Sequence, residues 1–184
     1  MNFRPAQQPA LIPFSSLPNQ PAPRLLTDAQ TSVMGLLEQI PVLERQRCVV
    51  QSFNPCPEYL DDVWQLEPCV LLSGPQPQAT LNWALERAVT GQRYRQPAHF
   101  TSSLIPSERV LLRYLPSGLS NKHIAKRLKL SDRTVRNRLV DIGEKWGLEN
   151  RTQIAMYYAG QWQWLERYRN LLWNSSNEVL NAAD

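Results

Sequence analysis

Short amphipathic helices joined by tight turns are the structure that residues 106–146 most strongly indicate. Apolar side chains recur there at spacings of three and four residues, which places them on one face of each helix. In the longest segment they are Val135, Leu139, Ile142 and Trp146. Such stripes need a partner surface, so we expect this part of the chain to fold as an all-α bundle.

Capping residues divide this bundle into successive helices. Pro106 suits the first turn of a helix, and the turn at residues 116–118 ends that helix. Ser120 and Ser131 are typical N-caps for a second and a third helix. The second and third helices are therefore predicted to be separated by a turn of only a few residues.

Positive charge is concentrated in the same region. Residues 101–159 hold eleven Lys and Arg and five Asp and Glu, a balance of +6, whereas residues 1–100 and 160–184 each balance at −1. The formal +4 of the whole chain therefore comes from one segment. Such clustering is the pattern expected of a protein that binds nucleic-acid phosphates.

Four stretches of this segment resemble the LuxR/FixJ-type helix-turn-helix of bacterial transcriptional regulators. They are residues 104–112, 118–128, 130–138 and 150–153. The resemblance implies a four-helix DNA-binding domain over residues 101–160. Its helix-turn-helix would span residues 121–140, and residues 131–146 would form the recognition helix that enters the major groove.

The resemblance also implies roles for individual residues. Arg136 would contact guanine O6 and N7 or a phosphate, Asn137 would contact adenine, and Val140 would pack on a thymine methyl. Thr134 would contact a phosphate at the start of the helix. The other predicted DNA contacts are Asn121, Lys122, Arg133, Arg138 and Lys145. The alternative for each basic residue is a solvated helix face.

Two departures from the family pattern concern helix ends and contacts. Ile105 stands where Thr usually precedes the proline, so the first helix loses a side-chain N-cap worth ~1 kcal/mol. Arg138 replaces the usual His. Neither change removes a polar group that would face the groove, so we expect DNA binding with an altered base preference.

Strand and helix candidates alternate over residues 24–96, which indicates a small parallel α/β sheet. The predicted strands and helices lie at residues 24–27, 31–40, 46–53, 57–66, 69–72 and 80–90. Only about three strands fit. The predicted fold class is therefore an α/β module followed by an all-α helix-turn-helix domain.

Both ends of this module resemble the receiver domain of response regulators. Residues 25–30 lie where receivers carry their first strand and acidic pair, and residues 79–94 resemble the last receiver helix. However, Asp28 is followed by an alanine, and the strand at residues 69–72 ends in Ser73 where the resemblance puts the phosphorylated aspartate. We expect a shortened module without conventional phosphotransfer. An unrelated α/β fragment that only dimerises is the alternative.

The two ends of the chain have distinct compositions. Residues 1–23 hold six prolines, which indicates a disordered tail. The fourth helix is predicted to run from Thr152 to Trp173, interrupted only at Gly160, into a Trp-rich extension and tail over residues 161–184. That extension would either pack on the α/β module or form a dimer interface.

Several classes of protein are excluded by the same sequence. Cys48, Cys56 and Cys69 have no disulfide or metal-binding spacing, so we expect reduced, partly buried thiols and no bound metal or cofactor. No nucleophile or phosphate-binding motif points to an enzyme. No apolar run suggests a membrane span, and the first residues lack the pattern of a signal peptide, so we expect a cytoplasmic protein.

The sequence therefore predicts a transcriptional regulator that binds duplex DNA as a homodimer and acts by recruiting or obstructing RNA polymerase. The alternative is a protein-interaction adaptor whose helix-turn-helix no longer engages DNA.

Overall fold

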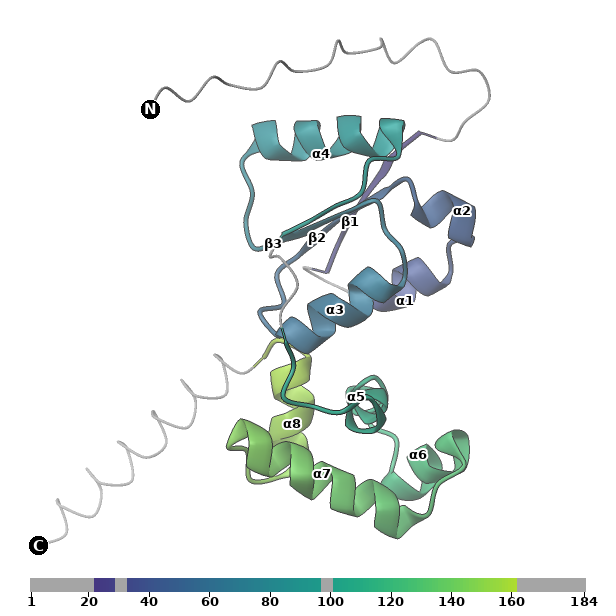
Figure 1. Cartoon of the computed structure of the whole chain (residues 1–184), viewed down its shortest axis with the longest axis vertical. Helices are drawn as coiled ribbons and strands as arrows, with labels where there is room; N and C mark the ends of the chain where they lie inside the picture. Colours follow the sequence, from purple (N-terminus) through teal and green to yellow (C-terminus); the bar gives the residue numbers. More distant parts are fainter. Residues whose placement is uncertain (1–21, 29–32, 97–100, 162–184) are drawn as a thin grey trace, which may run out of the picture.

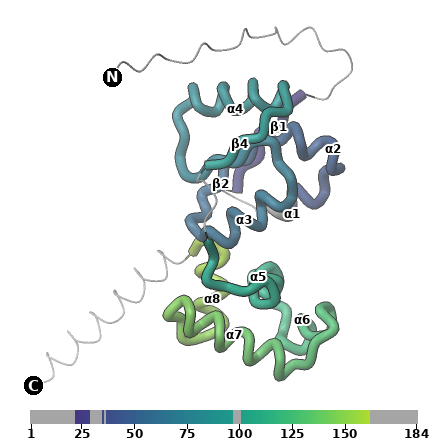
Figure 2. The backbone as a smooth tube through the Cα atoms, viewed as in Figure 1, coloured from purple at the N-terminus to yellow at the C-terminus, as the bar shows by residue number. Residues whose placement is uncertain are grey.

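A computed structural model of the chain describes residues 22–28, 33–96 and 101–161. Its N-terminal module contains a parallel sheet with the strand order β1-β2-β3-β4, of which Figure 1 labels β1 to β3 and Figure 2 labels β4. The strands are β1 (Arg24–Thr27), β2 (Cys48–Ser52), β3 (Val70–Ser73) and β4 (Tyr94–Arg95). The three predicted strands are confirmed. The sequence did not predict β4, because two residues are too few to show an alternating pattern.

Helices cover both faces of this sheet. They are α1 (Val33–Glu38), α2 (Val42–Arg45), α3 (Pro57–Gln65) and α4 (Gln78–Thr90). On one face α1 and α3 pack over Val50 and Leu71, whereas α4 packs on the other face over Val49 and Leu72. Burial on both faces explains why β2 is buried at every position. The short helix α2 was not predicted.

The order of the strands has a consequence for the connections between them. Doubly wound sheets usually cover both faces by reversing their strand order part-way. Here the strands follow one another across the sheet in sequence order, yet α3 and α4 lie on opposite faces. The β2–β3 and β3–β4 crossovers therefore have opposite hands, so one of them departs from the usual right-handed rule.

The C-terminal domain is a bundle of short helices, as predicted. They are α5 (Pro106–Leu112), α6 (Asn121–Leu128), α7 (Asp132–Trp146) and α8 (Arg151–Tyr158). Ser120 and Ser131 cap α6 and α7 through their side chains, as expected. Ile105 supplies no side-chain cap to α5, but its N–H donates to the Glu108 carboxylate at 2.9 Å.

The prediction for the fourth helix needs a correction. α8 begins at Arg151 and ends at Tyr158, and Gly160 takes the left-handed conformation, with φ at +77°. The helix therefore ends before Gly160 rather than continuing through it. The remainder of the predicted helix and its tryptophans Trp162, Trp164 and Trp173 lie outside the described residues, as does most of the predicted N-terminal tail.

The two modules share a hydrophobic core. Tyr59, Leu60 and Val63 of α3 belong to the same buried cluster as Leu111 of α5 and Tyr158 of α8. In Figures 1 and 2, α8 lies between α3 and α7. Cys48, Cys56 and Cys69 are buried, so they are more enclosed than the partial burial that the sequence predicts. Within the described ranges, none of the helices is long and apolar enough to span a bilayer.

Candidate nucleic-acid interface

The helix-turn-helix is formed by α6, a three-residue turn and α7. Lys129 takes the left-handed conformation at the end of α6, and the N–H of Leu130 donates to the Ala125 carbonyl at 2.8 Å. This turn ends α6 and redirects the chain into α7. Val135, Leu139 and Ile142 of the predicted stripe are buried, and Trp146 at its end is partly buried. One face of α7 is therefore fixed against the bundle.

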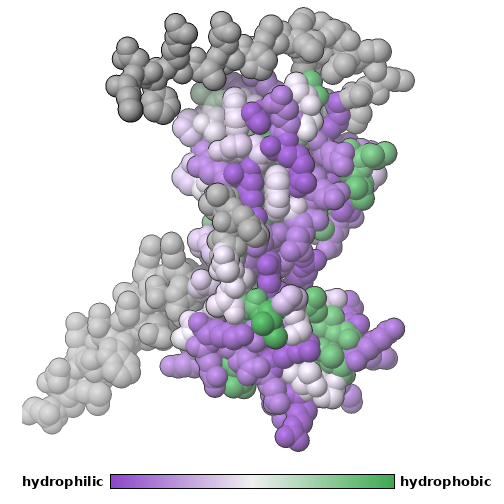
Figure 3. Space-filling view, viewed as in Figure 1, coloured by the Kyte–Doolittle hydropathy of each residue, from purple (hydrophilic) through white to green (hydrophobic). Residues whose placement is uncertain are grey.

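The opposite face of α7 is open to solvent. We define the recognition face as Arg133, Arg136, Asn137 and Val140, all of which are exposed. Val140 is 55% exposed although it is apolar, so it offers a methyl surface without a partner in the described structure. Hydrophilic side chains cover most of the lower end of the molecule, over α6 and α7, in Figure 3. A face of this composition suits contact with base edges.

Arg136 is held by an ion pair one turn back along the helix. Its guanidinium lies 2.6 Å from the Asp132 carboxylate, and the two side chains are 68% and 42% exposed. An exposed pair of this kind is worth under about 1 kcal/mol. The guanidinium is therefore free to exchange this partner for a base or a phosphate.

The first turn of α7 presents backbone donors. Ser131 Oγ accepts the N–H of Thr134 at 3.0 Å and lies 2.8 Å from the Thr134 hydroxyl. The preceding N–H groups, of Asp132 and Arg133, have no acceptor within the helix. A helix start with such donors suits a phosphate oxygen, as predicted for Thr134. Lys122, near the start of α6, is also exposed.

Three further predicted DNA contacts have partners on another helix of the domain. Lys145 Nζ lies 2.7 Å from both carboxylate oxygens of Glu108, which is buried. Arg138 donates to the Ser107 carbonyl at 3.1 Å, and Asn121 accepts from Arg151. The sequence could not show these partners, because each lies thirty or more residues away along the chain. The contacts attach α7 to α5, and α6 to α8.

Arg151 was not among the predicted site residues. Its guanidinium donates to the Asn121 side chain and to the Leu119 carbonyl, so it ties the start of α8 to the start of α6. Burial lowers the pKa of this guanidinium. Next to it, a cavity of about 440 Å³ lies between α7 and α8 and includes Val140 and Asn150 in its wall. Arg151 therefore holds α6 and α8 together beside this cavity.

Comparison with known families agrees with this geometry. The family described as "Bacterial regulatory proteins, luxR family" matches residues 102–158. Residues 102–158 form a LuxR-family helix-turn-helix domain. The LuxR-type domain contains all nine predicted DNA contacts.

Two named relatives are similar to this chain over 56 and 65 residues. An HTH-type transcriptional regulator of Mycobacterium tuberculosis is 48% identical over 65 residues, which are 35% of this chain and 7% of that protein. The DNA-binding transcriptional activator DevR/DosR of the same species is 45% identical over 56 residues, which are 30% of this chain and 26% of the relative. The matched parts are thus small fractions of both relatives.

Solved structures include RcsB from Salmonella enterica serovar Typhimurium bound to the promoter rprA. It is 23% identical to this chain, the match covers 61% of this chain and 54% of RcsB, and the TM-score is 0.38.

Proposed function

We propose that this chain is a transcriptional regulator that binds specific sequences of duplex DNA through α7. The observation that supports it best is the recognition face, which stays exposed while the rest of α7 is fixed by its buried stripe and by contacts with α5. A rigid helix with a basic and amide-bearing outer face is suited to the major groove. The proposed setting is the bacterial cytoplasm.

In the proposed complex, some of the exposed residues contact bases and others contact phosphates. Arg136 contacts guanine O6 and N7, Asn137 contacts adenine, and Val140 packs on a thymine methyl. Lys122, Arg133 and the first turn of α7 at Thr134 contact phosphates, which supplies affinity without sequence preference. For Asn121, Arg138 and Lys145 we propose a supporting role, because their polar atoms link one helix of the domain to another.

We propose further that the protein acts as a homodimer on two half-sites and recruits or obstructs RNA polymerase. We also propose that it is not controlled by conventional aspartate phosphorylation. Asp28 at the end of β1 already accepts hydrogen bonds from the Ser52 hydroxyl and, at 2.7 Å, from the Phe53 N–H. Strand β3 ends in a serine, Ser73.

The test is selection of bound duplexes from a random library, followed by gel shifts of the selected sequence and of random DNA at two salt concentrations. We expect a selected sequence that binds at least ~10³-fold more tightly than random DNA, with affinity that falls steeply as salt rises. Equal retention of selected and random duplexes would contradict the proposal. It would instead favour an adaptor whose helix-turn-helix has lost DNA binding.

A further inference from the structure

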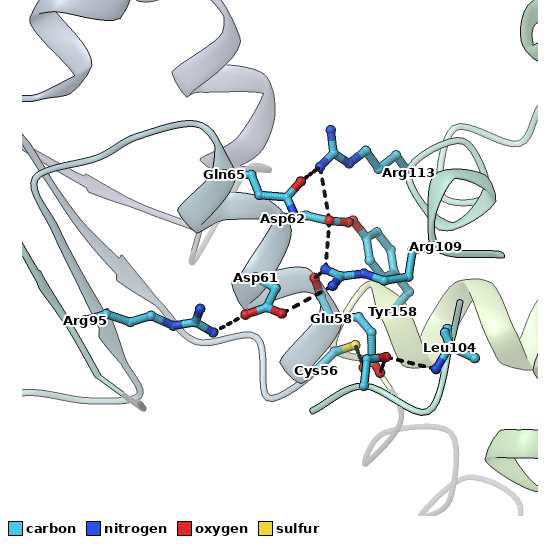
Figure 4. Close-up of polar contacts among 11 residues, drawn as sticks. Cys56, Glu58, Asp61, Asp62, Gln65, Arg95, Leu104, Arg109, Arg113 and Tyr158 are labelled. Carbon is cyan, nitrogen blue, oxygen red and sulfur yellow. Dashed lines mark hydrogen bonds and ion pairs between the residues drawn. The ribbon is translucent and has the colours of Figure 1, made fainter. Parts of the chain in front are cut away.

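Two adjacent buried carboxylates on α3 hold the DNA-binding domain against the N-terminal module. Figure 4 shows Asp61 between Arg95 and Arg109, with Asp62 facing Arg113 and Tyr158. These six residues are called the junction cluster. Asp61 and Asp62 are 3% and 2% exposed. Buried carboxylates are costly unless they are paired, so the position of their partners matters for stability.

Asp62 has partners on two helices of the LuxR-type domain. Its carboxylate lies 3.1 Å from Arg109 and 3.0 Å from Arg113, both at the α5 end of the junction. It also accepts the Tyr158 hydroxyl of α8 at 2.7 Å. Burial and then the Asp62 charge raise the pKa of Tyr158, so the phenol stays protonated and remains a donor. A single side chain of α3 thereby fixes both α5 and α8.

A second contact attaches the end of α8 to the N-terminal module. Asn54, in the loop between β2 and α3, donates from Nδ2 to the Tyr158 carbonyl at 2.9 Å. This carbonyl is in the last turn of α8, where no further helical N–H is available to it. Asn54 therefore acts as a C-terminal cap that comes from the other module.

The held helices in turn support α7. Arg138 and Lys145 attach α7 to α5, and Trp146 packs against Tyr157 of α8 with ring centroids 4.7 Å apart. Meanwhile α7 lies on the side of α5 and α8 that faces away from α3 (Figure 1). The recognition face therefore stays exposed while the modules are docked.

We infer that the docked arrangement is the DNA-binding state of this chain, and that Asp62 is the positioning residue that holds the LuxR-type domain in it. This inference rests on the proposed function. Contacts between domains of one chain usually permit relative motion. Here a shared apolar core, buried ion pairs and a helix cap act together, so the orientation of α7 relative to the sheet is fixed before DNA arrives.

The experiment measures a distance across the junction by pulsed electron paramagnetic resonance. Spin labels are placed on L43C, where Leu43 is 81% exposed on α2, and on S117C in the turn after α5. The native thiols are buried, and burial raises the pKa of Cys56 to about 12, so they react poorly with the label. Labelled protein is diluted with unlabelled protein, so that distances within one chain are measured.

We expect one narrow distance distribution that does not change when the selected duplex or a random duplex is added. In Asp62→Asn the distribution should broaden, and affinity for the selected duplex should fall by roughly tenfold, within the usual range of coupling between sites. Tyr158→Phe is a milder variant for the case that Asp62→Asn folds poorly. Glu44→Gln is the matched control, since it removes an exposed ion pair with Arg24 in the same module.

Two outcomes would overturn the inference. One is a distribution that broadens or shifts when the selected duplex is added to the wild-type protein. The other is tighter DNA binding by Asp62→Asn, which would make docking an inhibitory contact. If instead the wild-type protein selects no sequence, the proposed function fails, whereas a narrow distance lost in Asp62→Asn would still establish the docking role of Asp62.

Discussion

The recognition face and the junction cluster both depend on arginine, but they place it in opposite surroundings. Arg136 is 68% exposed and has one weak partner on its own helix, whereas the side chains of Arg95 and Arg109 are 8% and 18% exposed and contact buried carboxylates. An exposed guanidinium can exchange its partner, while a buried one must keep it. Charge available to DNA is therefore smaller than the +6 of residues 101–159, because Asp61 and Asp62 of the other module neutralise part of it.

The largest effect is expected where a buried ion pair is broken. Asp62→Ala leaves Arg109, Arg113 and the Tyr158 hydroxyl without this acceptor, so the free energy of unfolding should fall by about 3–5 kcal/mol. Urea unfolding followed by circular dichroism measures this. Glu44→Gln, at an exposed pair, should cost under about 1 kcal/mol. Equal losses of unfolding free energy in the two variants would show that the junction cluster stabilises the fold no more than an exposed ion pair does.

The next effect concerns the end of α8. Gly160→Ala should lower the free energy of unfolding by about 2 kcal/mol, because φ is +77° and the new Cβ would lie 2.8 Å from Asn54 Cγ. Thermal unfolding in the wild-type and Asn54→Ala backgrounds separates the two causes. The loss should be smaller once the Asn54 side chain is gone. An identical loss in both backgrounds would assign the whole effect to backbone conformation.

At the recognition face, a substitution should affect binding and leave folding almost unchanged. Arg136→Ala should weaken binding to the selected duplex by about 1–3 kcal/mol and change the free energy of unfolding by less than about 0.5 kcal/mol. Fluorescence anisotropy with the selected duplex and with random DNA gives the ratio of the two affinities. If affinity for random DNA fell by the same factor, Arg136 would be a phosphate contact and not a base contact.

The smallest effect on DNA affinity is expected at Lys122, and it should distinguish this lysine from Lys145 in the same domain. Lys122→Gln should weaken binding to all duplexes alike and reduce the slope of log affinity against log salt by about one. Lys145→Gln is the comparison, because Lys145 pairs with buried Glu108. It should lower the melting temperature and leave the salt slope unchanged. A reduced salt slope for Lys145→Gln would show that Lys145 contacts a phosphate after all.

Much of this architecture is predictable from local sequence, and the side-chain contacts that the sequence missed have a common cause. The stripe of Val135, Leu139 and Ile142 and the caps at Ser120 and Ser131 are local signals, and all were confirmed. Long-range ion pairs leave no local signal. The partner of Lys145 is 37 residues away, and the two arginine partners of Asp62, Arg109 and Arg113, are 47 and 51 residues away.

One local hint of the junction was present in α3. Asp61 and Asp62 adjoin the apolar residues Leu60 and Val63, so two acids sit beside the buried side of that helix. A solvated helix would place such acids on its polar face. Their burial indicates that α3 contacts a basic partner. Which residues form that partner could be seen only in the folded structure.

The cap that Asn54 supplies to α8 has a consequence for how such proteins are assembled from parts. The DNA-binding domain lacks, within its own sequence, the group that completes the last turn of its final helix. A chimera that joins residues 101–161 to another module would therefore lose this amide together with the two carboxylates of α3. A new N-terminal module would therefore have to supply an amide and two carboxylates at the positions of Asn54, Asp61 and Asp62.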